Sequence, residues 1–200
     1  MNLENKTHII GADEVGYGAL AYSLVVCGVR APKDWSLDGL NDSKKLSEKR
    51  RLIMTGKLNE LILKKEISFH IAERTNVEID QVGIAVALKQ SYVEIFHKLY
   101  DPQCQIIVDG ILKFDNMGVD GYDIISIIKA DTKIPAVMAA SILAKTYRDG
   151  KMKSIANLYP NYGFDKNVGY GSAIHMEAIK KYGPCEIHRM SYAPMKNMKK

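Results

Sequence analysis

The sequence predicts a mixed α/β domain built on one central sheet, and two observations carry this prediction. Short β-rich apolar runs near the start of the chain give way to alternating helical and strand patterns further along it. The 200 residues, 46% hydrophobic and 26% charged, have the size and balance of one domain that can bury a core. We therefore expect a single domain over residues 1–200.

The first half of the chain predicts three strands and two helices. Residues 7–13 and 19–30 are apolar runs separated by the glycine-bearing segment EVGYG, which predicts two antiparallel strands joined by a tight turn. Residues 67–74 predict a third strand. Between the second and third strands, apolar residues at helical spacing follow Ser47, a suitable N-cap, and predict a helix with a basic outer face. Residues 77–100 predict one longer helix.

The second half repeats the alternation of strand and helix. Residues 105–110 (QIIVDG) and 122–131 (YDIISIIKAD) predict buried strands that end in acidic residues. The small-residue-rich stretch 134–159 predicts a helix with its proline in the first turn. Residues 173–183 predict a shorter helix that closes on a glycine. The domain therefore has acidic residues at or beside the ends of several strands.

The composition also restricts where the protein works. No apolar run approaches the roughly 20 residues needed to span a bilayer, and the start, MNLENKTH, lacks the apolar stretch of a secretory signal. The odd number of cysteines, three in all, shows none of the spacings of a zinc site, so we expect reduced thiols. We expect a cytoplasmic protein without a membrane partner. The first predicted strand begins so close to Met1 that we also expect no preceding domain.

The basic residues are clustered. The net charge is +5 and the pI is about 8.9, with Lys and Arg gathered in residues 43–51, at 180–181 and in the terminal KNMKK. Such clusters suit a polyanion, because each neutralised phosphate releases counterions. The alternative interpretation is a set of solvated lysines that keep a small protein in solution.

Carboxylates at the strand ends are the candidate catalytic residues. Asp13 and Glu14 end the first predicted strand, Asp109 ends the fourth, and Asp131 follows the fifth. The first and fourth strands would bring Asp13 and Asp109 together if they were adjacent. Hard oxygen ligands select Mg²⁺ or Mn²⁺. Two such ions, roughly 4 Å apart, can activate water and stabilise the leaving oxygen in phosphodiester cleavage.

Two considerations weigh against this interpretation. An isolated acid at a strand end is more often a cap or a turn former than a ligand. Asp13 and Glu14 are also successive residues, whose side chains point to opposite faces of a regular strand. Both can serve one site only if the strand breaks there, which Gly16 and Gly18 would permit.

The order of several motifs connects these acids to a known family. GADEVGYG, LNDSKKLSEKRR, IVDG, KAD, AASILAKTYRD, YPNYGF and KYGPCEIHRMSYAP resemble, in this order, the motif series of type 2 ribonuclease H, ribonuclease HII. The resemblance runs from about residue 9 to 195. It implies a ribonuclease H-like fold, a five-stranded mixed sheet flanked by helices. It further implies a catalytic core over about residues 1–155 and a C-terminal helical extension over about 156–200 that grips the duplex.

The resemblance also implies an activity and its partners. A member of this family is an endoribonuclease that hydrolyses the RNA strand of RNA/DNA hybrids. It also incises 5′ of ribonucleotides embedded in duplex DNA, leaving a 3′-hydroxyl and a 5′-phosphate. The implied partners are these two nucleic acids, and we expect a monomer. The implied cofactors are Mg²⁺ or Mn²⁺ in a two-metal site, with a metal-activated water as the attacking group.

Individual residues acquire roles through the same motifs. The resemblance makes Asp13, Glu14, Asp109 and Asp131 the catalytic, metal-binding set. Its substrate-binding positions fall on Gly16, Tyr17, Gly18, Ser43, Lys44, Lys45, Lys145, Tyr170 and Arg189. The glycine turn reads the ribose 2′-hydroxyl through main-chain groups, and Tyr170 lies against the neighbouring sugar. Read without the family, His188 is a buried hydrogen-bonded histidine and Arg189 a surface arginine; His175 carries no assignment.

The sequence departs from the family pattern in its recognition residues. Tyr17 stands where the family has an arginine, and Gly171 and Ser172 replace the proline and threonine that usually follow Tyr170. Losing the arginine removes a charged phosphate contact, and Tyr17 could stack on the substrate instead. Two alternatives remain open: a DNA nuclease of the same fold and a hybrid-binding protein without turnover. The glycine turn with Tyr170 argues against the first alternative, and retention of all the carboxylates argues against the second.

Overall fold

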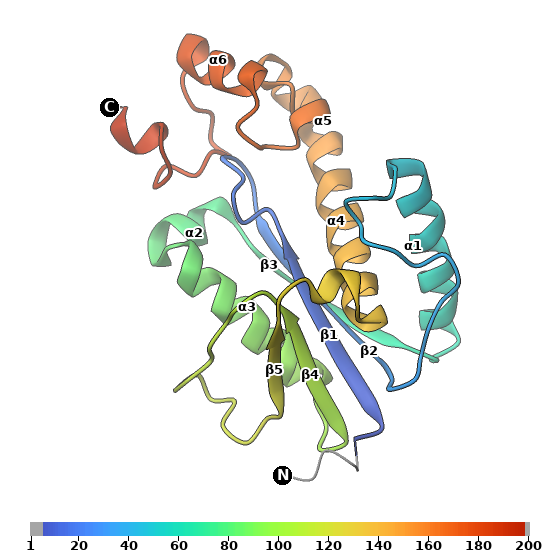
Figure 1. Cartoon of the computed structure of the whole chain (residues 1–200). Helices are drawn as coiled ribbons and strands as arrows, with labels where there is room; N and C mark the ends of the chain where they lie inside the picture. The colour runs from blue at the N-terminus through green and yellow to red at the C-terminus, as the bar shows by residue number, and fades with distance from the viewer. Residues whose placement is uncertain (1–5, 199–200) are drawn as a thin grey trace.

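A five-stranded mixed sheet forms the centre of the molecule (Figure 1). The computed structural model describes residues 6–198, in which the strands lie in the order β3-β2-β1-β4-β5. The strands are β1 (His8–Val15), β2 (Leu24–Pro32), β3 (Ser68–Arg74), β4 (Cys104–Asp109) and β5 (Ile124–Ile127). β1 pairs antiparallel with β2 and parallel with β4, which confirms the predicted mixed sheet and the adjacency of the first and fourth strands.

Helices cover both faces of this sheet. They are α1 (Glu48–Leu63), α2 (Asn76–Val82), α3 (Ile84–Leu99), α4 (Pro135–Ile155), α5 (Phe164–Asn167) and α6 (Ala173–Tyr182). Single turns of 3₁₀ helix form η2 (Ala130–Thr132), η3 (Ala156–Leu158), η4 (Pro160–Tyr162) and η5 (Met195–Asn197). α3 packs on one face, whereas α4 crosses the other face with α1 beside it; α5 and α6 lie beyond the carboxyl end of β1 (Figure 1).

Two predicted elements were wrong in their extent. The single helix predicted over 77–100 is two helices, because Gly83 adopts a φ of +82° and ends α2 before α3 begins. The second strand begins at Leu24 rather than at residue 19, so a loop over residues 16–23 replaces the expected tight turn. That loop pairs with the C-terminal segment through an isolated bridge between Ala21 and His188.

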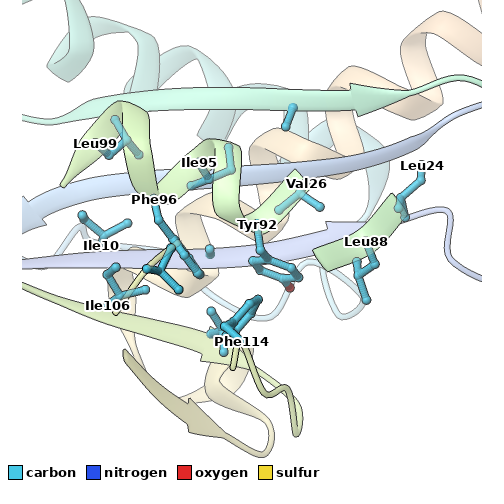
Figure 2. Packing of buried hydrophobic residues seen from close by; sticks show 14 of the residues in the cluster. Ile10, Leu24, Val26, Leu88, Tyr92, Ile95, Phe96, Leu99, Ile106 and Phe114 are labelled. Carbon is cyan, nitrogen blue, oxygen red and sulfur yellow. The ribbon is translucent and has the colours of Figure 1, made fainter. Parts of the chain in front are cut away.

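The core beneath α3 brings a tyrosine to the end of β1. Tyr92 and Phe96 project from α3 toward the sheet, where Phe114 meets both rings at centroid distances of 5.8 and 5.1 Å (Figure 2). Ile10 and Ile106 of the adjacent strands β1 and β4 complete this cluster. All but Phe114 are fully buried, so the ring of Tyr92 is fixed by close packing.

On the opposite face, α4 lies against β1 at very short range. A Cβ atom added to Gly11 would lie 2.3 Å from the backbone nitrogen of Val137, so only glycine permits this approach. The close crossing places successive turns of α4 beside the end of β1. Ser141, Lys145 and Arg148 of α4 thereby reach the region of the predicted site.

Some expectations fall on segments outside the described range. The first five residues of MNLENKTH and the last two lysines of KNMKK lie outside residues 6–198. Across that range, none of the helices combines the length and the apolar character that crossing a membrane requires.

Candidate active site

The carboxyl ends of β1 and β4 border one pocket of about 410 Å³. Asp13 and Glu14 reach it from β1, and Asp109 reaches it from β4, as the adjacency of the two strands requires. Its other lining residues come from the last position of β1, the loop after it, the segment before α1, α4 and the segment before α6. They are Val15, Gly16, Tyr17, Gly18, Ser43, Lys44, Ser141, Lys145 and Tyr170.

Asp13 and Glu14 share this pocket without a break in β1, contrary to our expectation. β1 continues in register to Val15, so the two side chains point to opposite faces of the sheet. Asp13 faces α4, where the neighbouring Ser141 hydroxyl lowers its pKa. Glu14 faces α3 and accepts a hydrogen bond from the Tyr92 hydroxyl at 2.6 Å. Both carboxylates border the same pocket because the strand ends just beyond them.

Burial and mutual repulsion raise the pKa values of these carboxylates. Burial raises the pKa of Asp13 to about 7, and the neighbouring Glu14 raises it as well. Burial also raises the pKa of Glu14; the hydrogen bond from Tyr92 opposes this shift and the charge of Asp109 adds to it. Nearby positive charge would reverse these shifts, so the cluster favours a cationic ligand.

Asp131 lies next to this pocket and is paired with a lysine. The backbone N–H of Ala130 donates to Asp109 Oδ1 at 2.7 Å and ties the end of β4 to the turn η2, which carries Asp131. Asp131 is only 3% exposed, and its Oδ2 accepts a hydrogen bond from Lys44 Nζ at 2.9 Å. Lys44 itself lines the pocket, so Asp131 is connected to the other acids through this lysine.

The donor set matches a hard divalent cation in its chemistry. Within residues 6–198, no three His, Cys, Asp or Glu side chains converge closely enough to hold a metal ion as they stand. Asp13, Glu14 and Asp109 nevertheless supply only oxygen donors to one pocket, which is the chemistry that Mg²⁺ and Mn²⁺ prefer. Glu14 is engaged by Tyr92 and Asp131 by Lys44, so ligation would require these two acids to exchange partners.

The loop after β1 is held from below by a buried arginine of α4. Arg148 is fully buried and donates through Nε to the carbonyl of Ser23, through Nη2 to that of Ala21, and through Nη1 to that of Val168. A Cβ atom on Gly16, whose φ is +88°, would lie 2.4 Å from Arg148 Nε. Glycine is therefore required here both for its backbone conformation and for space.

Arg189 is a second buried arginine under the same loop, and its burial contradicts the prediction that it binds substrate. It is fully buried, and it donates through Nε to the carbonyl of Tyr22 and through Nη1 to that of Tyr17, at 2.9 and 3.0 Å. A guanidinium bound to carbonyls in the interior cannot reach a phosphate. The expectation of a surface arginine was wrong for the same reason, whereas His188 is indeed buried and hydrogen-bonded.

The remaining predicted residues divide between the pocket and the surface. Lys145 lines the pocket and pairs with Asp149 at 3.0 Å. Ser43 is buried, and its hydroxyl lies 2.8 Å from that of Ser141. Lys45 is exposed and lies outside the lining of this pocket.

Sequence reasoning missed three residues that shape the site: Tyr92, Ser141 and Arg148. Tyr92 occupies an apolar position of a helix, where nothing distinguishes it from a core residue. Ser141 and Arg148 fall within the motif AASILAKTYRD, each about one turn from Lys145 on either side of it. The helical spacing of that motif was the only available signal, because residues three or four apart share one face.

The raised pKa of Asp13 predicts a pH-dependent effect of Asp13→Asn on stability. A carboxyl whose folded pKa exceeds its unfolded value of 3.8 favours the folded state when protonated, so wild-type stability falls as pH rises from about 4 through 7. Asparagine does not ionise. In EDTA, the Tm of the variant relative to wild type should therefore rise by several degrees between about pH 5 and about pH 8. Thermal melts followed by circular dichroism measure this difference, and a difference independent of pH would contradict the assignment.

Comparison with known proteins gives a consistent picture at the level of sequence. The sequence model of the family described as Ribonuclease HII matches residues 10–195. The Ribonuclease HII of Clostridium beijerinckii is 43% identical over 190 residues, which cover 92% of this chain and 67% of that protein. The Ribonuclease HII of a Sulfurovum species is 42% identical over 191 residues, which cover 95% of this chain and 94% of that protein.

Solved structures share the architecture. The ribonuclease H2 of Pyrococcus horikoshii matches with a TM-score of 0.76 at 23% identity, over 95% of this chain and 96% of that chain. Bst-RNase HIII, solved in complex with Mn²⁺, matches with a TM-score of 0.69 at 19% identity, over 96% of this chain and 70% of that chain. At these identities the likeness concerns the fold, and it confirms the predicted ribonuclease H-like class.

Proposed function

Because this chain belongs to the ribonuclease HII family and is an endoribonuclease of the ribonuclease H type, we propose that it incises 5′ of ribonucleotides embedded in duplex DNA. The same site would cut the RNA strand of RNA/DNA hybrids. One observation carries the proposal: the carboxylates of β1 and β4 share a pocket with the glycine turn and Tyr170. Acids able to hold cations thus lie beside backbone able to approach a sugar closely.

In this proposal Asp13, Glu14, Asp109 and Asp131 hold Mg²⁺ or Mn²⁺. Two such cations, when bound, supply activation of the attacking water and charge neutralisation at the leaving oxygen, which departs as a 3′-hydroxyl and leaves a 5′-phosphate. The chain's own cations bind the backbone: Lys44 and Lys145 border the pocket, where they would neutralise phosphates flanking the cut. Lys44 is suited to this role because its side chain is 72% exposed while its ammonium remains beside the acids.

Recognition of the ribose would rest on the loop after β1 and on Tyr170. The backbone N–H of Gly16 donates to the Tyr170 hydroxyl at 3.1 Å. A hydroxyl that accepts one hydrogen bond still has its own proton to donate, and Tyr170 lines the pocket where a sugar would lie. At Gly18 a Cβ atom would meet nothing within 4 Å, so the backbone borders open space there. A 2′-hydroxyl, which DNA lacks, can pair with these main-chain groups.

We propose that residues from about 1 to 155 form the catalytic core and that residues from about 156 to 200 form an extension that grips the duplex. Within the extension, Lys180 and Lys181 lie in the last turn of α6, beyond the carboxyl end of β1. Because these lysines lie outside the carboxylate pocket, they would contact phosphates away from the cut.

A duplex with one embedded ribonucleotide tests the proposed activity. In Mg²⁺ or Mn²⁺, the wild-type protein should make a single cut on the 5′ side of the ribonucleotide, because the turn and Tyr170 detect one 2′-hydroxyl. Sequencing-gel mapping of the product and its end groups measures this. A matched all-DNA duplex should remain intact. Cleavage of both duplexes would favour a DNA nuclease, and binding without cleavage in either metal would favour a hybrid-binding protein.

Tyr17 is expected to set how strongly the protein depends on charge for binding. Its ring is 43% exposed and borders both the carboxylate pocket and an adjoining pocket lined by Leu88 and Ile111. Tyr17→Arg should steepen the dependence of log K on log salt by about one unit, because it adds one cation near the phosphates. Fluorescence anisotropy in EDTA at several salt concentrations measures the slope. Tyr17→Phe is the matched control; an unchanged slope for Tyr17→Arg would place this side chain away from the backbone.

A further inference from the structure

Two buried histidines behind the site contact each other directly. His175 of α6 and His188 of the C-terminal segment are both fully buried, and their Nε2 atoms lie 3.0 Å apart. The rings of Tyr162 and Phe164 pack around the pair, with centroids between 5.1 and 6.3 Å from the imidazoles. The remaining ring nitrogens face outward from the pair in opposite directions, His188 Nδ1 toward Cys185 and His175 Nδ1 toward Tyr170.

The hydrogen-bond partners determine where each proton lies. The backbone N–H of Cys185 donates to His188 Nδ1 at 2.9 Å, whereas the carbonyl of the same residue, which could accept from a protonated Nδ1, lies farther away at 3.2 Å. The shorter contact assigns an unprotonated Nδ1, so the proton of the neutral ring is on Nε2. His188 Nε2 therefore donates to His175 Nε2, which must accept. The proton of His175 is then on Nδ1, which donates to the carbonyl of Tyr170 at 2.9 Å. All the hydrogen bonds in this series therefore donate in the same direction, from Cys185 through both imidazoles to Tyr170.

This arrangement requires both imidazoles to be neutral. Protonation of His175 would turn two N–H groups toward each other, and protonation of His188 would direct a third N–H at the backbone N–H of Cys185. Burial lowers the pKa of His188 to about 4, and His175 lowers it as well; burial also lowers the pKa of His175. The titratable groups that face the pair are the Cys185 thiol, 3.1 Å from His188 Nδ1, and Tyr162, whose hydroxyl donates to Gly183.

The series of hydrogen bonds leads from the histidine pair to Tyr170, which lines the proposed site. The Tyr170 carbonyl accepts from His175 Nδ1 and from the backbone N–H of Ser172 at 2.8 Å, so its backbone is fixed from behind. At the other end of the same residue, the Tyr170 hydroxyl accepts from the N–H of Gly16 in the carboxylate pocket. The position of the Tyr170 ring relative to the glycine turn is thus linked to His175 by consecutive hydrogen bonds.

We propose that His175 and His188 are positioning residues that act as a neutral pair of fixed tautomers and hold Tyr170 in register with the glycine turn for recognition of the ribonucleotide. This inference rests on the proposed function, because Tyr170 must be a recognition residue for its position to affect cleavage. The pair touches neither substrate nor the reacting atoms. Its effect reaches the site only through Tyr170 and should appear mainly in substrate binding.

Nitrogen NMR of the full chain with ¹⁵N-labelled imidazoles tests the pair without any assay of activity. His188 should be protonated at Nε2 and His175 at Nδ1, with His188 remaining neutral down to about pH 5 and His175 titrating below its ordinary pKa. The exposed His97 serves as the internal reference in the same spectra. A different tautomer at either ring, or protonation of the pair near neutral pH, would overturn the assignment.

Replacement of His175 tests whether the pair matters for recognition. An asparagine amide can donate to the Tyr170 carbonyl from near the position of Nδ1, whereas leucine cannot. His175→Leu should raise KM for the single-ribonucleotide duplex about tenfold with a smaller change in kcat, and His175→Asn should restore most of the loss. His97→Asn is the control for a histidine removed elsewhere. Equal effects of Asn and Leu would show that only the packing of the site matters and would contradict the proposal.

A double-mutant cycle with Tyr170→Phe separates positioning from general destabilisation. If His175 acts through Tyr170, His175→Leu should change KM less than threefold once the Tyr170 hydroxyl is absent. Multiplicative effects of the two substitutions would overturn the proposal. If His175→Leu does not fold, the cycle is run with His175→Gln, and the NMR spectra of wild type still decide the tautomers. If wild type makes no cut beside a ribonucleotide, the proposed function fails, and the tautomer assignment is judged separately by those spectra.

Discussion

Asp109→Asn is expected to lower kcat for metal-dependent cleavage by about 1,000-fold or more while leaving the protein folded. Asparagine retains an oxygen that can accept from the N–H of Ala130, so the link between β4 and the turn η2 is kept. What disappears is one negative charge from the pocket shared with Asp13 and Glu14. Because the cations are expected to be held by charge as well as by geometry, both their binding and the neutralisation of the leaving oxygen should suffer.

Single-turnover cleavage of the ribonucleotide-containing duplex measures this loss, with circular dichroism to check the fold. Asp34→Asn, which removes the same charge from an exposed position after β2, should retain wild-type rates. Asp13→Asn should behave like Asp109→Asn in cleavage. An Asp109→Asn protein within tenfold of wild type would remove this carboxylate from the proposed metal-binding set.

Arg148→Met should produce the largest loss of stability, about 3–5 kcal/mol in the free energy of unfolding. Methionine fills much of the same space but leaves the carbonyls of Ala21, Ser23 and Val168 without their donor in the interior. A buried acceptor without a partner costs about 1–3 kcal/mol. Partial relaxation of the structure around the three carbonyls keeps the total loss of stability in the lower part of the range that their sum would give. The loop after β1 and the segment that carries Tyr170 should then separate, so cleavage should fall together with stability.

Urea unfolding gives the measurement, as a lower midpoint at an unchanged slope. Arg148→Lys should be intermediate, because an ammonium retains the charge but lacks the planar fork that reaches three carbonyls. Arg50→Met, at an exposed position of α1, is the matched control and should change stability by less than about 0.5 kcal/mol. A loss below about 1 kcal/mol for Arg148→Met would mean that water replaces the guanidinium at little cost.

The parts of this fold that follow from local periodicity could be predicted from sequence. The strands carrying Asp13 and Asp109 were recognisable because buried strands are continuous apolar runs, and the motif order connected them to one sheet. The break between α2 and α3 was missed, because a glycine within a helical pattern is compatible with an uninterrupted helix; only its φ of +82° distinguishes the two cases.

That Asp13 and Asp109 lie in one pocket could be predicted from sequence, but the residues that support the pocket could not. Arg189 follows a histidine in a polar segment, and no local pattern distinguishes an arginine that binds phosphate from one that binds carbonyls of a loop 167 positions away. Residue periodicity likewise could not predict how Asp13 and Glu14 border the same pocket, since this depends on β1 ending at Val15, just beyond them. Both facts arise from tertiary contacts, which leave no trace in the spacing of residues.

The two arginines beneath the loop after β1 have a consequence for how its selectivity could be altered. They grip the carbonyl oxygens of Tyr17, Ala21, Tyr22 and Ser23, atoms that every amino acid possesses. Apart from Gly16, the shape of the loop is thus held by residues outside it, and the side chain at position 17 is free to differ without disturbing that shape. A set of variants at this one position would change the side chain that meets the substrate while the loop keeps its conformation. Changes of substrate preference could then be separated from changes of folding.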